Sequence, residues 1–174
     1  MSTPTTEYDS IRARLDDPET AIEDGHRKIE WAREHMPILH ELRGEFERDQ
    51  PLSGETVGMA MHVEAKTAAL TELLAAGGAE VAITGCNPLS TQDDIAAALA
   101  NGGTEIYAWP GLDTEDFYWC IERTIDKPPH LTLDDGADLI FTVHSAHKDM
   151  AEHILGGREE TTHGLHRLPA LRND

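Results

Sequence analysis

The chain has 174 residues, of which 33 are Asp or Glu and 14 are Lys or Arg, so its formal net charge is −19. This length suits one ordinary domain with its own hydrophobic core. The strong negative charge excludes binding to nucleic acid or to anionic membranes through a basic surface, and no apolar run approaches the roughly 18 residues of a membrane-spanning helix.

The charge distribution also indicates where the protein works. Acidic residues occur along the whole chain, and only four of the basic residues are lysines. Most of these charges form a solvated surface, and their excess is typical of a halophilic cytoplasm, where concentrated salt screens self-repulsion. No secretory signal is evident at the N-terminus. The two cysteines, Cys86 and Cys120, form no CxxC pair, so we expect neither a disulfide framework nor a zinc knuckle.

The first part of the chain predicts a flexible N-terminus followed by two helices. Residues 1–17 are expected to be flexible. A helix is predicted over residues 18–33, with Pro18 in its first turn, and a second over residues 37–48, which the stretch "QPLSG" ends.

From residue 56 onwards the pattern alternates between strands and helices. We predict strands at residues 56–61, 81–83, 105–109 and 131–133, and helices at residues 65–76, from 90 or 91 to 101, and from 113 to the Pro-Pro pair at 128–129. The fold class is therefore α/β: a three-layer, Rossmann-like parallel sheet with helices on both faces, preceded by N-terminal helices. Residues 18–174 form one domain.

The residues just past the strand ends are the candidate functional residues, because ligands of such sheets bind outside the carboxyl ends of the strands. An imidazole, a thiol, an amide and several carboxylates fall there. They belong to His62, Glu64, Cys86, Asn87, Asp134 and Asp135.

The segment "CNPLSTQDD" contains two kinds of polar group. Ser90 with Asp93, or Thr91 with Asp94, predicts a capping box at the start of a helix. Capping does not explain the preceding thiol and amide. Cys86 alone is typical of a small buried group rather than a nucleophile, since no neighbouring base can be placed from sequence.

Three further patterns leave their roles open. His62 is either a structural histidine or an acid–base group facing Asp135. Adjacent acids such as those of "LTLDDGADL" can bind a metal, hold a ribose, transfer protons or start the next helix. The later histidines form no ligand spacing, so we expect no metal site. The run "GGREETTHG" is typical of a helix start, and its acids and threonines can also bind hydroxyl groups.

Taken together, five segments resemble S-adenosylhomocysteine hydrolase, the adenosylhomocysteinase family. They are "MAMHVEAKTAAL", "GAEVAITGCNPLSTQDDIAAAL", "IYAWPGLDTEDFYWCIERT", "LTLDDGADL" and "GREETTHGLHRL". The resemblance extends from about residue 21 to residue 167. It implies the NAD-dependent, reversible hydrolysis of S-adenosyl-L-homocysteine to adenosine and L-homocysteine through oxidation of the ribose 3′-hydroxyl.

The resemblance also implies roles for single residues. His62 and Asp135 shuttle protons near the 5′ position, and Glu160 holds a ribose hydroxyl. The substrate cleft is lined by Cys86, Asn87, Ser90, Thr91 and Gln92, with Glu64 and Asp135 also at the substrate. The nicotinamide nucleotide is approached by Thr161, Thr162 and His163.

The sequence departs from the family in three ways. Glu64 and Lys66 stand where the family often has a threonine and an acid that contact adenine, and His163 replaces a third threonine. No glycine-rich GxGxxG turn follows a strand, so we expect this chain to lack the family's NAD-binding domain and to be inactive alone. The alternatives are a stand-alone adenosine-type binding module or an inactive remnant. Its expected partner is a small-molecule substrate, and the resemblance implies that full-length members of the family form homo-oligomers, as tetramers.

Overall fold

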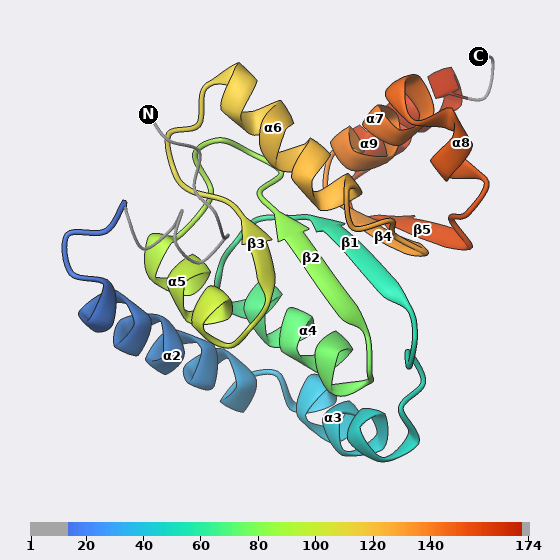
Figure 1. The fold of residues 1–174 in the computed structure, drawn as a ribbon. Helices are drawn as coiled ribbons and strands as arrows, with labels where there is room; N and C mark the ends of the chain where they lie inside the picture. The colour runs from blue at the N-terminus through green and yellow to red at the C-terminus, as the bar shows by residue number, and fades with distance from the viewer. Residues whose placement is uncertain (1–13, 172–174) are drawn as a thin grey trace.

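Five parallel strands form one sheet in the order β3-β2-β1-β4-β5 (Figure 1). The computed structural model describes residues 14–171, so most of the predicted flexible N-terminus, residues 1–13, lies outside the described residues. The strands are β1 Thr56–Ala60, β2 Glu80–Thr84, β3 Glu105–Tyr107, β4 Leu131–Asp134 and β5 Gly156–Glu159. The direction in which the chain adds strands reverses between β1 and β4, where an α/β sheet of this kind opens a crevice.

Helices cover both faces of the sheet, as the sequence predicts (Figure 1). On one side lie α2 Pro18–Glu34, α3 Pro37–Asp49, α4 Ala65–Ala76 and α5 Asp93–Asn101. On the other lie α6 Thr114–Ile125, α7 Asp138–Ala146, α8 Lys148–Ala151 and α9 Thr162–Leu171. Helix α2 packs across α4 and α5. The three-layer, Rossmann-like class is therefore confirmed.

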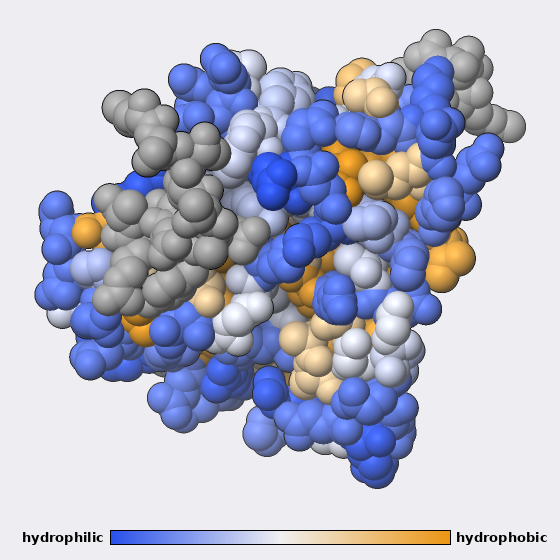
Figure 2. All heavy atoms as spheres, viewed as in Figure 1, coloured by the Kyte–Doolittle hydropathy of each residue, from blue (hydrophilic) through white to orange (hydrophobic). Residues whose placement is uncertain are grey.

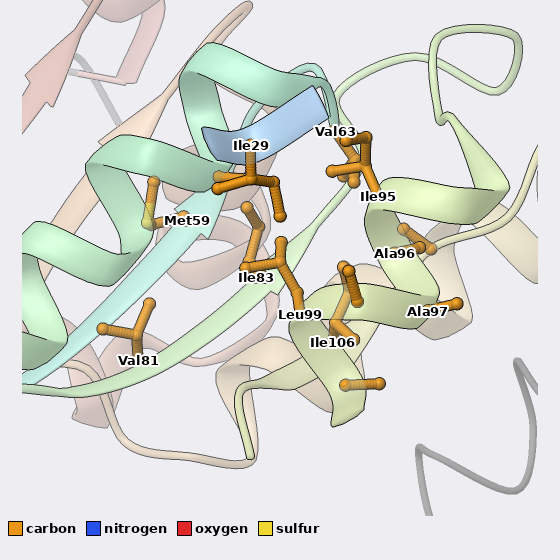
Figure 3. Close-up of a cluster of buried hydrophobic side chains, with 14 of the residues drawn as sticks. Ile29, Met59, Val63, Val81, Ile83, Ile95, Ala96, Ala97, Leu99 and Ile106 are labelled. Atoms are coloured by element: carbon orange, nitrogen blue, oxygen red, sulfur yellow. The ribbon is translucent and has the colours of Figure 1, made fainter. Parts of the chain in front are cut away.

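Two hydrophobic clusters lie on opposite faces of the sheet. In the first, Met59 of β1 and Ile83 of β2 pack beneath Ile29 of α2, and all three side chains are fully buried (Figure 3). In the second, Ala60 of β1 packs with Ile121 of α6. Strand β1 is thus buried on both faces, which explains its uninterrupted apolar sequence. Each large buried side chain stabilises the fold by about 1.5–3 kcal/mol.

Helix α2 approaches α5 so closely that one glycine is required. A Cβ atom on Gly25 would overlap the backbone carbonyl of Asp94. Ion pairing adds to the contact, because Lys28 Nζ lies 2.5 Å from Asp94 Oδ2. The middle of the predicted helix over residues 18–33 therefore packs directly against α5. The Asp17 side chain caps its first turn.

Two predicted boundaries are wrong. Helix α5 begins at Asp93, after Gln92, and no side chain caps it. The backbone N–H of Gln92 instead donates to Val63 O at 2.9 Å, which keeps Gln92 extended. The Ser90 hydroxyl donates to Asn87 O at 3.1 Å. The predicted capping box is absent because the Ser90 hydroxyl serves the preceding loop, while the buried Thr91 hydroxyl has no hydrogen-bond partner among the described residues. Strand β3 ends at Tyr107, two residues earlier than predicted.

The fifth strand has no counterpart among the predicted strands. Its sequence, Gly-Gly-Arg-Glu, offers no apolar residue, and most of it is exposed at the edge of the sheet. Pairing with β4 places Asp134 beside Glu159. Among the described residues, no helix is long and apolar enough to cross a membrane. The face in Figure 2 is mostly hydrophilic, with smaller hydrophobic patches between.

Candidate active site

The candidate site lies at the carboxyl ends of β1, β2 and β4, on both sides of the point where the strand order reverses. Hydrogen bonds continue the sheet beyond the strand ends and hold the three following loops together. Cys86 N donates to Met61 O at 3.2 Å, and Asp135 N donates to Ala60 O at 2.9 Å. The residues that follow these strands are therefore positioned by the sheet.

Three side chains from these loops converge. The Cys86 Sγ atom lies 3.4 Å from His62 Nδ1, and His62 Nε2 lies 3.5 Å from Asp135 Oδ2. The imidazole side chain is 49% exposed and the Asp135 side chain 19%. A carboxylate and a half-exposed imidazole in this arrangement can pass a proton to or from a bound molecule. The structure thus brings together two residues that the sequence predicts as a proton-transfer pair, although their roles remain predictions.

The structure supplies the base beside Cys86 that the sequence could not place. Burial nevertheless, together with the negative charge of Asp135, raises the pKa of the Cys86 thiol to about 12. A thiol with that pKa stays protonated at neutral pH and is a poor nucleophile. The arrangement therefore suits acid–base chemistry at His62 better than covalent catalysis at Cys86.

The acid next to Asp135 has a different environment. Asp134 is only 2% exposed and its Oδ2 accepts a hydrogen bond from Ile140 N in α7 at 2.9 Å. Its Oδ1 is buried and has no hydrogen-bond partner among the described residues. Burial raises the pKa of Asp134 to about 7, and the charge of Glu159 contributes to the rise. Asp134 thus anchors the start of α7 from inside the fold.

Glu159, at the end of β5, holds the turn that carries Asp135. Its Oε1 accepts hydrogen bonds from Gly136 N at 2.9 Å and from the Thr161 hydroxyl at 2.6 Å. Burial acts to raise the pKa of Glu159, but the bonds from Thr161 and Gly136 outweigh it and lower the pKa. Gly136 has φ +109° and Ala137 φ +65°, so this turn is a left-handed one that needs such support.

Arg167 of α9 secures the same turn from the other side. Its guanidinium donates to Gly136 O at 2.5 Å and to Asp138 Oδ1 at 2.9 Å. Sequence reasoning did not select Glu159 or Arg167. The one signal for the former is Gly164 inside a helix, where a Cβ atom would overlap the Glu159 carboxylate.

The residues after β5 are placed at the same edge of the sheet. Glu160 N donates to Asp134 O at 2.9 Å, and the exposed Glu160 side chain pairs with Arg158 at 2.9 Å. The Thr161 hydroxyl accepts from Gly164 N at 2.9 Å, so the predicted helix start is confirmed. Thr162 and His163 are exposed in the first turn of α9.

The remaining predicted substrate-binding residues differ in which groups of the chain they contact. Asn87 is exposed, and its Oδ1 accepts from Leu89 N at 2.8 Å. Gln92 Oε1 accepts from Lys28 Nζ at 3.3 Å. Glu64 caps α4 through Oε1, which accepts from the amides of Lys66 and Thr67 at 3.0 Å. One of the Glu64 oxygens is therefore already engaged within the chain.

A separate surface cavity lies at the opposite, amino-terminal end of β2 and β3. It contains the ion pair between Lys127 and Glu105, at 2.5 Å, and none of the residues at the carboxyl strand ends. Its ionisable groups are Glu80, Glu105 and Lys127, and no imidazole or thiol lines it. We therefore assign the candidate site by the chemistry at the strand ends rather than by the depth of the surface.

Comparison with known proteins identifies the family of the chain. The family model for S-adenosyl-L-homocysteine hydrolase matches residues 16–151. The adenosylhomocysteinase of Halobacterium salinarum is 56% identical over 166 residues, which are 95% of this chain and 39% of that protein. That of Haloquadratum walsbyi is 53% identical over 173 residues, 96% of this chain and 40% of the relative. The S-inosyl-L-homocysteine hydrolase of Methanosarcina mazei is 56% identical over 154 residues, which are 88% of this chain and 38% of that relative.

Proposed function

Because the chain belongs to the S-adenosyl-L-homocysteine hydrolase family, we propose that it forms the substrate-binding part of an adenosylhomocysteinase. The reaction is the reversible hydrolysis of S-adenosyl-L-homocysteine to adenosine and L-homocysteine. The observation that carries the proposal is the convergence of His62 and Asp135 where the strand order reverses. A cytoplasmic location belongs to the proposal, because the net charge of −19 suits concentrated intracellular salt.

Proton transfer is the task of the converging side chains. Loss of homocysteine from the 5′ carbon requires a proton on the departing sulfur, and addition of water requires a proton to be removed from that water. His62 is half exposed and would serve both transfers, while Asp135, 3.5 Å from it, would orient the imidazole and stabilise its charged form. Glu160, at the same edge of the sheet, would accept a hydrogen bond from a ribose hydroxyl.

NAD is the cofactor that the family implies, and it would supply the reversible oxidation of the ribose 3′-hydroxyl. The residues past β5 fit contact with such a group in part. Thr162 and His163 are exposed and offer a hydroxyl and an imidazole in the first turn of α9. The Thr161 hydroxyl is already bonded to Glu159 and Gly164, so we expect its contribution to be indirect, through the position of the other two.

A chimera tests the proposal directly. The chain would be joined to the remaining part of the Halobacterium salinarum relative, and homocysteine release from S-adenosyl-L-homocysteine would be measured with NAD in molar KCl. Asp135→Asn should lower kcat by about 10²–10⁴-fold with little change in stability. Asp134→Asn is the matched control and should lower kcat far less. A folded chimera that binds adenosine but never releases homocysteine would favour a binding module over an enzyme.

A second candidate substrate is S-inosyl-L-homocysteine, the substrate named for the Methanosarcina mazei relative. Hypoxanthine presents an N1–H donor and an O6 acceptor, whereas adenine presents an N1 acceptor and an amino donor. Lys66 is exposed and can donate to O6, and the second carboxylate oxygen of Glu64 can accept from N1–H. The pair therefore complements a 6-oxopurine.

The two substrates are separated by one substitution in the chimera. If the 6-oxopurine is the true base, Lys66→Glu should shift the ratio of kcat/KM towards S-adenosyl-L-homocysteine by about 10-fold or more. Lys148→Glu, on α8, changes the net charge equally and serves as the control. An unchanged ratio in Lys66→Glu would remove this residue from base recognition.

A further inference from the structure

The cluster formed by Cys86, His62 and Asp135 has the composition of a metal site as well as of a proton-transfer site. One potential ligand atom from each residue lies within 4.8 Å of those of the other two. Sulfur, imidazole nitrogen and carboxylate oxygen are the three donor types that Zn²⁺ takes in proteins, and three protein ligands with one open position are typical of reactive zinc sites. The proposed proton transfer uses the imidazole and the carboxylate of this set and gives the thiol no chemical role.

The cluster differs from a chance grouping of surface side chains in how it is held. Its members follow three separate strands, β1, β2 and β4, and backbone hydrogen bonds fix two of the loops against β1 and its extension. Cys86 is half-buried and Asp135 is largely shielded from solvent. The sheet therefore presents these ligands together before any ion binds, which lowers the cost of ordering them.

The spacing suits a tetrahedral ion after a small adjustment. With metal–ligand distances of about 2.0–2.3 Å, ligand atoms of a tetrahedral zinc site are about 3.3–3.7 Å apart. The Cys86 Sγ–His62 Nδ1 distance is already 3.4 Å. The imidazole presents Nδ1 to Cys86 and Nε2 to Asp135, and only one of these nitrogens can bind the ion. Since one ligand atom from each residue lies within 4.8 Å of the others, closing the site requires the half-exposed His62 ring to turn and a shift of about 1 Å.

We propose that Cys86, His62 and Asp135 bind a thiophilic divalent cation of the Zn²⁺ class, and that this ion competes with substrate. Binding forms a metal–sulfur bond and releases the thiol proton to solvent, so no redox step is involved. The cation would occupy the two side chains that the proposed reaction needs for proton transfer, and would therefore inhibit. The competition rests on the proposed function, whereas the metal site itself does not.

Cobalt(II) is the probe, because a thiolate–cobalt bond absorbs in the near ultraviolet and tetrahedral cobalt has intense visible bands. We expect one equivalent of Co²⁺ to give both absorptions in the purified chain, and Zn²⁺ to abolish them by displacement. Other histidines of the chain can bind Co²⁺ too, but without a sulfur ligand they give no charge-transfer band.

Matched cysteine variants identify the sulfur. Cys86→Ala should lose the charge-transfer band, while Cys120→Ala should keep it, because Cys120 is fully buried in the cluster beneath α6. His62→Ala retains both cysteines and should weaken Co²⁺ binding at least about 10-fold. Absence of the band in the folded wild-type chain, or its persistence in Cys86→Ala, would overturn the site.

A nucleoside titration then tests the competition separately. Adenosine and inosine should each raise the apparent Kd for Co²⁺ if the nucleoside occupies the same strand ends. Cobalt binding that either nucleoside leaves unchanged, while calorimetry shows that the nucleoside binds, would overturn the competition and place the nucleoside elsewhere, with the metal site intact. A wild-type chain that shows no band before any nucleoside is added, but that binds the nucleoside, would overturn the metal site and leave the proposed function standing.

Discussion

Replacement of Asp134 by Asn should leave stability unchanged near pH 4 and raise it as the pH increases. Asp134 is 2% exposed, and burial raises the pKa of its carboxyl from 3.8 to about 7. Between these two pH values the folded chain therefore keeps a proton that the unfolded chain has released. The free energy of unfolding that Asp134 contributes is fully present below pH 4 and is lost as the pH rises to 7.

The size of the effect follows from the shift. A difference of about 3 pH units, at 1.36 kcal/mol for each unit, corresponds to about 4 kcal/mol. Asn cannot ionise, and its side-chain oxygen can still accept the hydrogen bond from Ile140 N. The variant should therefore match the wild-type chain near pH 4 and exceed it by up to about 4 kcal/mol near pH 8, where ionised Asp134 lies beside the Glu159 carboxylate.

Urea unfolding followed by tryptophan fluorescence measures this difference. Both proteins would be unfolded at 25 °C at intervals from pH 4 to pH 8. The KCl concentration would be in the molar range and the same in every sample. The wild-type free energy of unfolding, minus that of the variant, should fall by about 1.4 kcal/mol for each pH unit between pH 4 and pH 7 and level off above pH 7. Subtraction removes the contribution of the other acidic residues, which both proteins share.

An exposed acid provides the control for this measurement. Asp126 lies at the end of α6 and pairs with Arg123 at 2.6 Å on the surface, so the difference for Asp126→Asn should stay within about 1 kcal/mol throughout. A wild-type-minus-variant difference for Asp134→Asn that is flat between pH 4 and pH 8, or that rises, would refute the assignment of the proton to Asp134.

Three further outcomes test the charge and the packing. The thermal midpoint should rise substantially from dilute buffer to molar KCl, because a chain of net charge −19 repels itself at low ionic strength; a flat or falling midpoint would contradict a halophilic origin. Gly25→Ala should lower the free energy of unfolding by about 1–3 kcal/mol through overlap with the Asp94 carbonyl. Gly44→Ala in α3, where no atom lies within 4 Å of the added Cβ, should raise it by up to about 1 kcal/mol. Equal effects of the two substitutions in chemical denaturation would refute the close contact between α2 and α5. Thr161→Val should cost about 1–2 kcal/mol by the same assay, because it removes the cap of α9 and the donor to Glu159, and an unchanged midpoint would show that the cap is dispensable.

Local pattern determined most of the fold. Apolar runs of strand length, helical periodicity and the stops at Gly77-Gly78 and at residues 101–103 are properties of short segments, so the order of strands and helices follows from them. Helix α4 has the predicted bounds because Glu64 caps its start and Gly77 stands at its end. The same reasoning could locate His62, Cys86 and Asp135 at strand ends, since a strand end is a local feature.

Tertiary structure decided how those ends meet. Segment pattern says nothing about which strands are neighbours, and only the order β3-β2-β1-β4-β5 places His62 beside both Cys86 and Asp135. Strand β5 could not be predicted from the sequence for a related reason. It is held by pairing with β4 and has no apolar face of its own.

The choice between adjacent acids also belongs to tertiary structure. Asp134 and Asp135 are chemically identical in the sequence, but the first is enclosed beside Glu159 under α7 and the second reaches His62. The same holds for Ser90, which serves the loop of Asn87 instead of capping a helix. Side-chain chemistry sets which hydrogen bonds and proton transfers are possible, whereas burial and distance, which depend on the packing of remote segments, decide which of them occur.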